Sequence, residues 1–354
     1  MAYTTIDKSS LHYNTKLYTG TGSSNAVTGV GFQPDLCWIK NRGTTTATRV
    51  FDSVRTATKV LYTSETDAEA TAAQGLTAFG ADGFTVGTSS AINGSSNNIC
   101  SWNWKAGTTG SGTTTGTGTG KAYSYSVNTT AGFSIIKYLG NGNAGQQIPH
   151  HLGAVPHFIM LKPLDRTDNW RVYHHKQHDS SPANYQLKLN STNAIDSGSD
   201  VWNDTIPTST YFTLGSNAGV VANDEDFVAY CFANKTGYSK FSSYTGNSNS
   251  DGPFVYTGFK PSLVIIKGAI SGDGNAAQSW EMYDNKREGY NSDNNSLFPN
   301  LTSADGTSDR VDFFSNGFRP IINSDGVNDN HSRYIYMAFG QTLVSSNNIP
   351  ATAR

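Results

Sequence analysis

Short apolar runs separated by Gly, Asn and Pro make up most of the chain. Runs of about four to eight residues that are rich in Val, Ile, Tyr and Phe and bounded by turn residues are typical of strands. No run of about 18 apolar residues occurs, so the pattern predicts no helix that inserts into a membrane. The hydrophobic pattern therefore predicts an all-β protein.

One apolar run recurs three times, each time with a proline at its start and a lysine at its end. The copies are Pro34 to Lys40, Pro156 to Lys162 and Pro261 to Lys267. Consecutive apolar residues cannot all face one side of a strand, because side chains alternate between its two faces. We therefore predict a central strand covered on both faces in each copy, with the lysine marking the exit of the strand to solvent.

Other segments recur around this strand and define a repeat. An aromatic residue with a glycine turn precedes it, an aromatic strand that ends in a polar turn follows it, and a strand of alternating large residues closes each copy. The motif residues are Tyr18, Pro34, Lys40, Tyr138, Pro156, Lys162, Tyr244, Pro261 and Lys267. Copies of this length, with turns at short intervals, predict three tandem antiparallel β-sandwich units of jelly-roll-like form.

The repeats divide the chain into five segments. We assign residues 18–106, 121–236 and 237–354 to units 1, 2 and 3, the last with a C-terminal tail. We assign residues 1–17 to an attachment or edge segment outside the first core. Residues 107–120 consist only of Gly, Thr and Ser, a composition typical of flexible linkers. The sequence therefore predicts that the first unit can be displaced from the other two.

Composition and charge narrow the possible partners. The formal net charge is −2 and lysine and arginine are scattered, so a phosphate backbone or an anionic membrane is not attracted, and we expect no nucleic acid partner. Aromatic residues are spread along the chain, which argues against disorder. Cys37, Cys100 and Cys231 lie in apolar runs, where a free thiol acts as a small hydrophobic side chain, so we predict no disulfide framework.

Two groups of residues could hold a metal ion. One is the set of histidines His150, His151, His157, His174, His175 and His178. Imidazole is a good zinc ligand, but neighbouring side chains on a strand point to opposite faces, so we favour solvated or hydrogen-bonded histidines. The second group comprises the acidic runs 224–226 and 325–330, which offer oxygen ligands for calcium but are also ordinary turn formers, the reading that we favour. We predict no cofactor.

Catalytic residues are not indicated by any recurring pattern. Cleavage of a polysaccharide needs two carboxylates on opposite sides of a sugar. Asp52 and Asp284 recur, but His174 occupies the corresponding place in the second unit. No Gly-x-Ser-x-Gly elbow, the motif of a serine nucleophile, occurs. We therefore predict a protein that is not an enzyme, with a depolymerase of envelope polysaccharide as the lesser alternative.

With these motifs established, the chain resembles the repeat-containing virion structural proteins, tail fibre-like, of marine tailed bacteriophages. The resemblance rests on 18–22, 31–35, 38–40 and 51–55, and on Asp82-Gly83-Phe84, Trp102-Asn103-Trp104 and Ala338-Phe339-Gly340, so it covers nearly the entire chain. It implies a component of the virion and supplies no catalytic residues.

The resemblance leaves two roles open. The first is a tail-associated fibre or receptor-binding component that contacts the host envelope, since rigid sandwiches with Tyr-, Asn- and Ser-rich loops suit adaptable contacts. The second is a capsid decoration protein. Expected partners are other virion proteins of the tail or capsid, a host surface polysaccharide or receptor, and further copies in a homo-oligomer. The expected location is the exterior of the virion, after assembly in the host cytoplasm.

Overall fold

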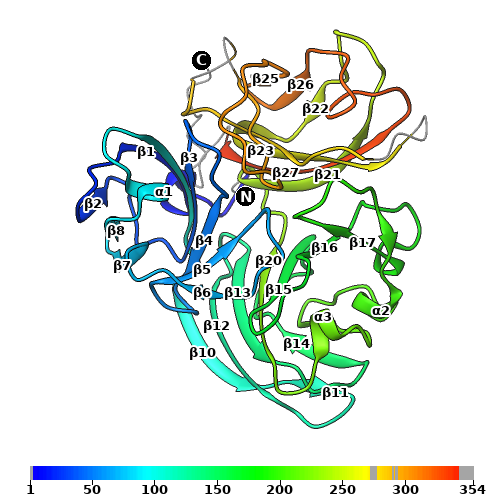
Figure 1. The fold of residues 1–354 in the computed structure, drawn as a ribbon. Coiled ribbons are helices and arrows are strands. Elements are labelled where there is room, and N and C mark those ends of the chain that lie inside the picture. Colours follow the sequence, from blue (N-terminus) through cyan, green and yellow to red (C-terminus); the bar gives the residue numbers. More distant parts are fainter. Residues whose placement is uncertain (1–2, 272–276, 289–290, 292–293, 343–354) are drawn as a thin grey trace.

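The computed structural model describes residues 3–271, 277–288, 291 and 294–342, and its sheets are antiparallel throughout these residues (Figure 1). Each third of the chain folds into a large sheet packed against a smaller one, so the predicted all-β sandwich fold is confirmed. We call residues 13–104 unit 1, residues 108–232 unit 2 and residues 239–342 unit 3. The units form three lobes around a common centre (Figure 1).

Unit 1 has a six-stranded sheet in the order β1-β9-β3-β4-β5-β6 and a three-stranded sheet in the order β2-β8-β7. A short 3-10 helix, Ser9–Leu11, precedes it. Its elements are β1 (Tyr13–Thr19), β2 (Asn25–Thr28), β3 (Leu36–Asn41), β4 (Arg49–Asp52), β5 (Lys59–Tyr62), β6 (Ala70–Thr71), β7 (Leu76–Gly80), β8 (Gly83–Val86), α1 (Ser90–Asn93) and β9 (Asn98–Trp104).

Unit 2 has an eight-stranded sheet in the order β10-β12-β13-β20-β15-β16-β17-β18 and a small sheet in the order β11-β14-β19. A 3-10 turn, Pro182–Asn184, precedes β17. Its other elements are β10 (Thr108–Thr113), β11 (Thr115–Gly116), β12 (Ala122–Asn128), β13 (Phe133–Leu139), β14 (Gln146–Pro149), β15 (Phe158–Pro163), β16 (Arg171–His174), β17 (Tyr185–Lys188), β18 (Asp196–Ser197), α2 (Ser199–Trp202), β19 (Tyr211–Thr213), α3 (Ala218–Val221) and β20 (Asp226–Phe232).

Unit 3 has a four-stranded sheet in the order β21-β27-β23-β24 and a small sheet in the order β22-β26-β25. Its elements are β21 (Ser239–Thr245), β22 (Val255–Tyr256), β23 (Phe259–Ile270), β24 (Glu281–Asp284), β25 (Val311–Phe314), β26 (Gly317–Pro320) and β27 (Arg333–Thr342).

The proline-led strands β3, β15 and β23 are covered on both faces, as their apolar runs predict. In β3, Leu36 and Trp38 face a core shared by all three units, whereas Cys37 and Ile39 face a core of unit 1 alone. The strands β15 and β23 alternate in the same way. The closing strands β9, β20 and β27 also contribute alternate residues to the shared core. Both faces of each closing strand are therefore buried.

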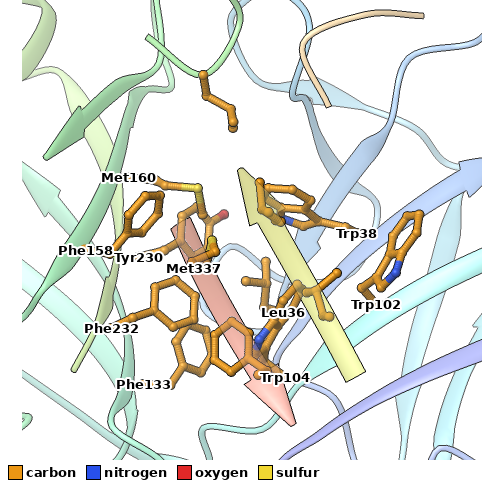
Figure 2. Packing of buried hydrophobic residues seen from close by; sticks show 14 of the residues in the cluster. Leu36, Trp38, Trp102, Trp104, Phe133, Phe158, Met160, Tyr230, Phe232 and Met337 are labelled. Atoms are coloured by element: carbon orange, nitrogen blue, oxygen red, sulfur yellow. The ribbon is translucent and has the colours of Figure 1, made fainter. Parts of the chain in front are cut away.

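Aromatic rings from different units meet in the shared core (Figure 2). The ring centroid of Trp104 lies 5.9 Å from Trp38, 6.3 Å from Phe232 and 5.8 Å from Phe339. Phe232 belongs to unit 2 and Phe339 to unit 3. Burial of large rings is the main stabilising contribution to such a core, so the three units stabilise one another.

Residues 107–120 form strands rather than the predicted flexible linker. β10 pairs with β12 along its length and β11 pairs with β14. Tyr125 lies over Gly110, with its hydroxyl 2.5 Å from the place of a Cβ atom, and Tyr123 lies over Gly112 in the same way at 2.7 Å. The rings supply the side-chain cover that glycine lacks in a strand. The predicted freedom of unit 1 is wrong for a second reason, because unit 1 shares its core with the others.

The prediction that residues 1–17 lie outside the first core is wrong for the described residues 3–17, although β1 is an edge strand of the large sheet, as the alternative predicted. Tyr13 begins β1, is buried, and stacks on Phe339 at a centroid distance of 5.4 Å. Ile6 is buried in the shared core, and Thr4 Oγ1 donates a hydrogen bond to the carbonyl oxygen of Thr236 at 2.6 Å. More buried and more exposed residues alternate along β1, which pairs with β9. The polar residues of β1 do not show this alternation in the sequence.

Candidate functional site

The motif lysines join the units instead of leaving their strands for solvent. Each ammonium group is fully buried and donates to a backbone carbonyl of a neighbouring unit. The pairs are Lys40 with Thr302 (3.0 Å), Lys162 with Thr66 (3.0 Å) and Lys267 with Thr192 (2.7 Å). The predicted exit to solvent is wrong, because the end of each strand abuts a loop of the next unit.

These lysine contacts run around the centre in one direction. Lys40 of unit 1 reaches unit 3, Lys267 of unit 3 reaches unit 2, and Lys162 of unit 2 reaches unit 1. A backbone hydrogen bond lies three residues further along each loop, and the pairs are Glu69 N with Leu164 O (2.8 Å), Ile195 N with Ala269 O (3.0 Å) and Asp305 N with Arg42 O (2.9 Å). The chain therefore closes a pseudo-threefold ring, with equivalent contacts at all three junctions.

Burial is the main cause of the lowered lysine pKa values. The pKa of Lys40 and Lys162 is lowered to about 8 and that of Lys267 to about 7. A lowered lysine pKa is also found in catalytic lysines. Here, however, the side chains have no exposed surface, and Lys40 also donates to the carbonyl oxygens of Thr44 and Thr46. We therefore assign these lysines to the junctions and not to catalysis.

A buried tryptophan strengthens two of the junctions. This tryptophan lies two residues before Val172 in unit 2 and two residues before Met282 in unit 3. These two residues pair with Met160 of β15 and Ile265 of β23, which face the shared core. The hydrogen bonds are Trp170 Nε1 to Tyr62 O (2.8 Å) and Trp280 Nε1 to Lys188 O (3.0 Å). Unit 1 has Thr48 at this position, and at its junction the hydroxyl of Thr63 donates to Pro299 O instead. The same contact between units is thus made by different side chains.

The recurring carboxylates Asp52 and Asp284 also serve the junctions. Asp284 Oδ2 accepts from Arg287 Nε at 2.6 Å and from Trp102 Nε1 of unit 1 at 3.2 Å. Asp52 Oδ2 accepts from Arg55 Nε and, at 2.6 Å, from Tyr230 Oη of unit 2. Both carboxylates are fully committed and buried, and each belongs to a different junction, so they are not the facing pair that polysaccharide cleavage requires.

His174 replaces the carboxylate in unit 2 for a structural reason. The neighbouring residue that corresponds to Trp102 and Tyr230 is Met337, which has no hydrogen to donate. His174 Nδ1 accepts from Lys176 N at 3.0 Å, as the aspartates do from their own turns, and Nε2 contacts Tyr336 O at 3.2 Å. Acceptance at Nδ1 fixes the neutral tautomer with the proton on Nε2, so the direction of the hydrogen bond between units is reversed.

Neutral buried histidines make the stability of the folded protein sensitive to acid. Burial holds the pKa of His174 well below its ordinary value and lowers that of His150 and His157 to about 4. Between about pH 6.5 and 4 these histidines therefore bind more protons in the unfolded chain than in the native one. Their contribution to stability is complete above about pH 6.5 and is lost as the pH falls.

We expect the urea midpoint of the parent protein to fall between pH 7.5 and 5, and His174→Asn to reduce this fall. His331→Asn is the matched control, because His331 is exposed and asparagine tolerates its positive φ of 55°. Equal pH dependence of parent and His174→Asn would contradict a role for His174.

The motif tyrosines and the glycines that follow them hold the edge of each sandwich. The hydroxyls donate to a carbonyl in the turn before the closing strand, and the pairs are Tyr18 with Ile92 (2.6 Å), Tyr138 with Val220 (2.8 Å) and Tyr244 with Val327 (2.6 Å). A Cβ atom on Gly20, Gly140 or Gly246 would lie 2.1–2.2 Å from a backbone oxygen of the same turn. The Tyr-x-Gly motif is therefore a structural clasp.

The motif prolines are buried at the start of the central strands. Pro34 and Pro156 precede β3 and β15, and Pro261 lies within β23 opposite Gly340, at a shift in register. A proline donates no ladder hydrogen bond and suits such irregular positions.

The proposed metal ligands have other roles. His157 and His175 rings lie 4.5 Å apart, but His175 Nε2 bonds to Phe241 O at 2.9 Å. The carboxylates of 224–226 face Lys121, Arg166 and Lys137. Asn328 in the run 325–330 is buried, and its side-chain amide donates to the carbonyl oxygen of Asn249 at 2.7 Å. Within the described part of the chain, no group of three or more His, Cys, Asp or Glu side chains could hold a metal. Cys37, Cys100 and Cys231 are free and buried.

A cleft of about 370 Å³ lies between unit 1 and the β10-β12 edge. Asp35 lines it, and burial raises the pKa of this carboxyl. Its oxygens accept from Ser53 Oγ at 2.7 Å and from Ala106 N at 2.8 Å. Among the described residues that line the cleft, Asp35 is the one carboxylic acid, whereas glycoside cleavage uses two.

Exposed aromatic side chains gather on the outer face of the small sheet of unit 3. Phe254 and Tyr256 are 50% and 53% exposed, while Val255 between them faces the core. Phe314 packs its ring against Phe254 at 5.6 Å, and the Arg319 guanidinium lies 5.5 Å from the Phe314 ring centroid. We call Phe254, Tyr256, Phe314 and Arg319 the unit 3 aromatic surface. Sequence reasoning missed it, because strand aromatics alone do not reveal which face is outside.

A polar groove of about 270 Å³ adjoins this surface at Tyr256. Tyr3, 41% exposed, lines the groove and donates to Gly258 O at 3.1 Å. Lys240 Nζ donates to Tyr256 O at 2.7 Å and lies 5.2 Å from the ring centroid of the same tyrosine. Aromatic faces beside convergent polar groups are typical of a binding site.

Comparisons with known proteins identify a family but no activity. The model of a family described as "Domain of unknown function (DUF7483)" matches residues 8–342. No curated protein matches the chain significantly. One solved structure, "Crystal Structure of the STIV MCP", is similar over 70% of this chain and 96% of its own chain, at 10% identity and a TM-score of 0.20. A similarity of that size has no bearing on function. Across the described residues, no helix is long and apolar enough to cross a membrane.

Proposed function

The chain belongs to the DUF7483 family, whose description names no function. From its geometry, together with the resemblance of its motifs to virion structural proteins, we propose that it is a non-enzymatic structural protein of a bacteriophage virion. The observation that carries the proposal is the use of the recurring polar residues. The repeated lysines, the carboxylates and the histidine that replaces one of them join the units, and the tyrosines hold the turns. A chain whose repeated chemistry is all structural is a scaffold, and function then lies on its exposed surfaces.

Within the virion we propose a tail-associated component that contacts the host envelope. The exposed aromatic surface of unit 3 supports this role, because Phe254 and Tyr256 are exposed and are not part of the core of that unit. A capsid decoration protein is the second candidate, favoured by the closed ring, which gives one chain a compact body (Figure 1). Partners in either case are other virion proteins, and further copies in a homo-oligomer.

The test is quantitative mass spectrometry and negative-stain microscopy of purified particles of the phage that encodes this chain, with labelling by a specific antibody. We expect the protein in mature particles at low copy number, with the label on the tail. A copy number near that of the shell protein would favour the capsid role. Absence of the protein from purified particles would refute both. Purified protein incubated with envelope polysaccharide is expected to release no reducing ends.

A further inference from the structure

We propose that the unit 3 aromatic surface and the adjoining groove form a binding site for a saccharide of low charge. This inference rests on the proposed exposed position in the virion and deepens it by naming the ligand class and the residues. It stands on the comparison of the three units, on the chemistry of the surface and on its charge balance.

The repeat itself provides the control for these aromatic residues. Val255 pairs with Phe318 in unit 3 as Val27 pairs with Phe84 in unit 1, and all four belong to buried cores. The outward positions beside Val27 are Ala26 and Thr28, and Gly80 takes the place of Phe314 through the equivalent hairpin. In unit 2 the outward neighbours of Ile148 are Gln147 and Pro149. Tyr211 lies on this face of unit 2, opposite Pro149. Unit 1, however, builds the same small sheet without an aromatic side chain at these positions, so unit 3 does not need them for folding.

The geometry of the surface suits a sugar ring. Tyr256 and Phe314 lie opposite Gly317 on the central strand β26. The Phe254 ring covers the place of a Cβ atom on Gly317, at 2.9 Å, so aromatic side chains lie across the width of the small sheet. A pyranose presents a flat face of C–H groups to such rings and hydroxyls at its edge. Arg319, Lys240 and the Tyr3 hydroxyl supply polar groups at the margin.

Charge balance distinguishes a saccharide of low charge from a polyanion. Arg319 is paired with Asp251 at 2.6 Å and lies 4.0 Å from Asp312. These three side chains sum to −1, and Lys235 and Lys240, which line the groove, bring the whole site to +1. A charge that small does not attract a phosphate-rich ligand strongly. The aromatic patch is also interrupted by these charges, unlike the continuous apolar centre of a stable protein interface.

The experiment uses the full chain on an array of purified bacterial O-polysaccharides and capsular polysaccharides, followed by calorimetric titration of the strongest binder. We expect saturable binding that falls about tenfold or more in Tyr256→Ala and in Phe254→Ala, the effect of losing one stacked ring. Tyr256→Phe keeps the ring and is expected to retain most of the affinity. Ile206→Ala in unit 2 is the matched control, because Ile206 is 55% exposed and lies elsewhere, and its binding is expected to be unchanged.

Two results would overturn the saccharide site. One is failure of the parent protein to bind any array member, and the other is binding that the Tyr256 and Phe254 substitutions leave unchanged while their melting temperatures match the parent. If the chain is found in purified particles and either binding result is obtained, the virion role stands and only the saccharide site is refuted. Absence of the chain from particles, with saccharide binding lost in Tyr256→Ala, would do the reverse.

Discussion

Trp104→Ala is expected to lower the free energy of unfolding by about 3–5 kcal/mol, the usual cost of deleting a large buried ring. Trp104 is buried and contacts rings from all three units. The cavity would therefore open at the shared centre and not within one unit. We expect one cooperative transition for the whole chain at a lower temperature, with coincident melting curves from far-ultraviolet circular dichroism and tryptophan fluorescence.

Two variants control this prediction. Trp104→Phe keeps most of the ring volume, and the indole Nε1 that it removes has no hydrogen-bond partner among the described residues, so a much smaller loss is expected. Phe254→Ala removes an exposed ring and is expected to cost less than about 0.5 kcal/mol. Separate transitions, with unit 1 melting first, would show that the units are independent, as residues 107–120 suggested from sequence alone.

Asp284→Ala is expected to destabilise the protein by about 3–5 kcal/mol, because it leaves a buried guanidinium without its main partner. The side chains of Asp284 and Arg287 are 0% and 2% exposed, and the carboxylate also accepts the hydrogen bond of Trp102 from unit 1. The substitution therefore breaks an ion pair and a contact between units together. The measurement is the free energy of unfolding from urea titration at pH 7.5.

The double variant Asp284→Ala with Arg287→Ala is expected to cost less than the sum of the two single changes, since no unpaired charge remains buried. Asp179→Ala serves as the control. Its ion pair with Arg333 lies at the surface, where the Asp179 side chain is 79% exposed, and such pairs contribute about 0–1 kcal/mol. A similar small loss in Asp284→Ala would mean that this junction does not stabilise the ring.

The sequence alone determined the strands, the repeat and the double cover of the central strands. Alternation of Leu36, Cys37, Trp38 and Ile39 is local information, because side chains of a strand must face opposite ways. The same alternation in three copies sufficed to predict three antiparallel sandwiches. It could not reveal that the second cover of each central strand comes from the other two units.

Only the tertiary structure decided where the polar motif residues go. The sequence pattern of a lysine at the end of an apolar strand is the same whether its side chain meets water or a carbonyl group of the next unit. The pattern therefore predicted that Lys40 is exposed. His174 breaks the pattern of recurring carboxylates, and the reason is Met337, which lies far away in the sequence. Gly110 is part of a strand because the Tyr125 ring covers it, and Tyr13 is buried because β1 pairs with β9. Each depends on a partner brought close by folding, and hydrogen bonding and packing act on distance in space and not on distance along the chain.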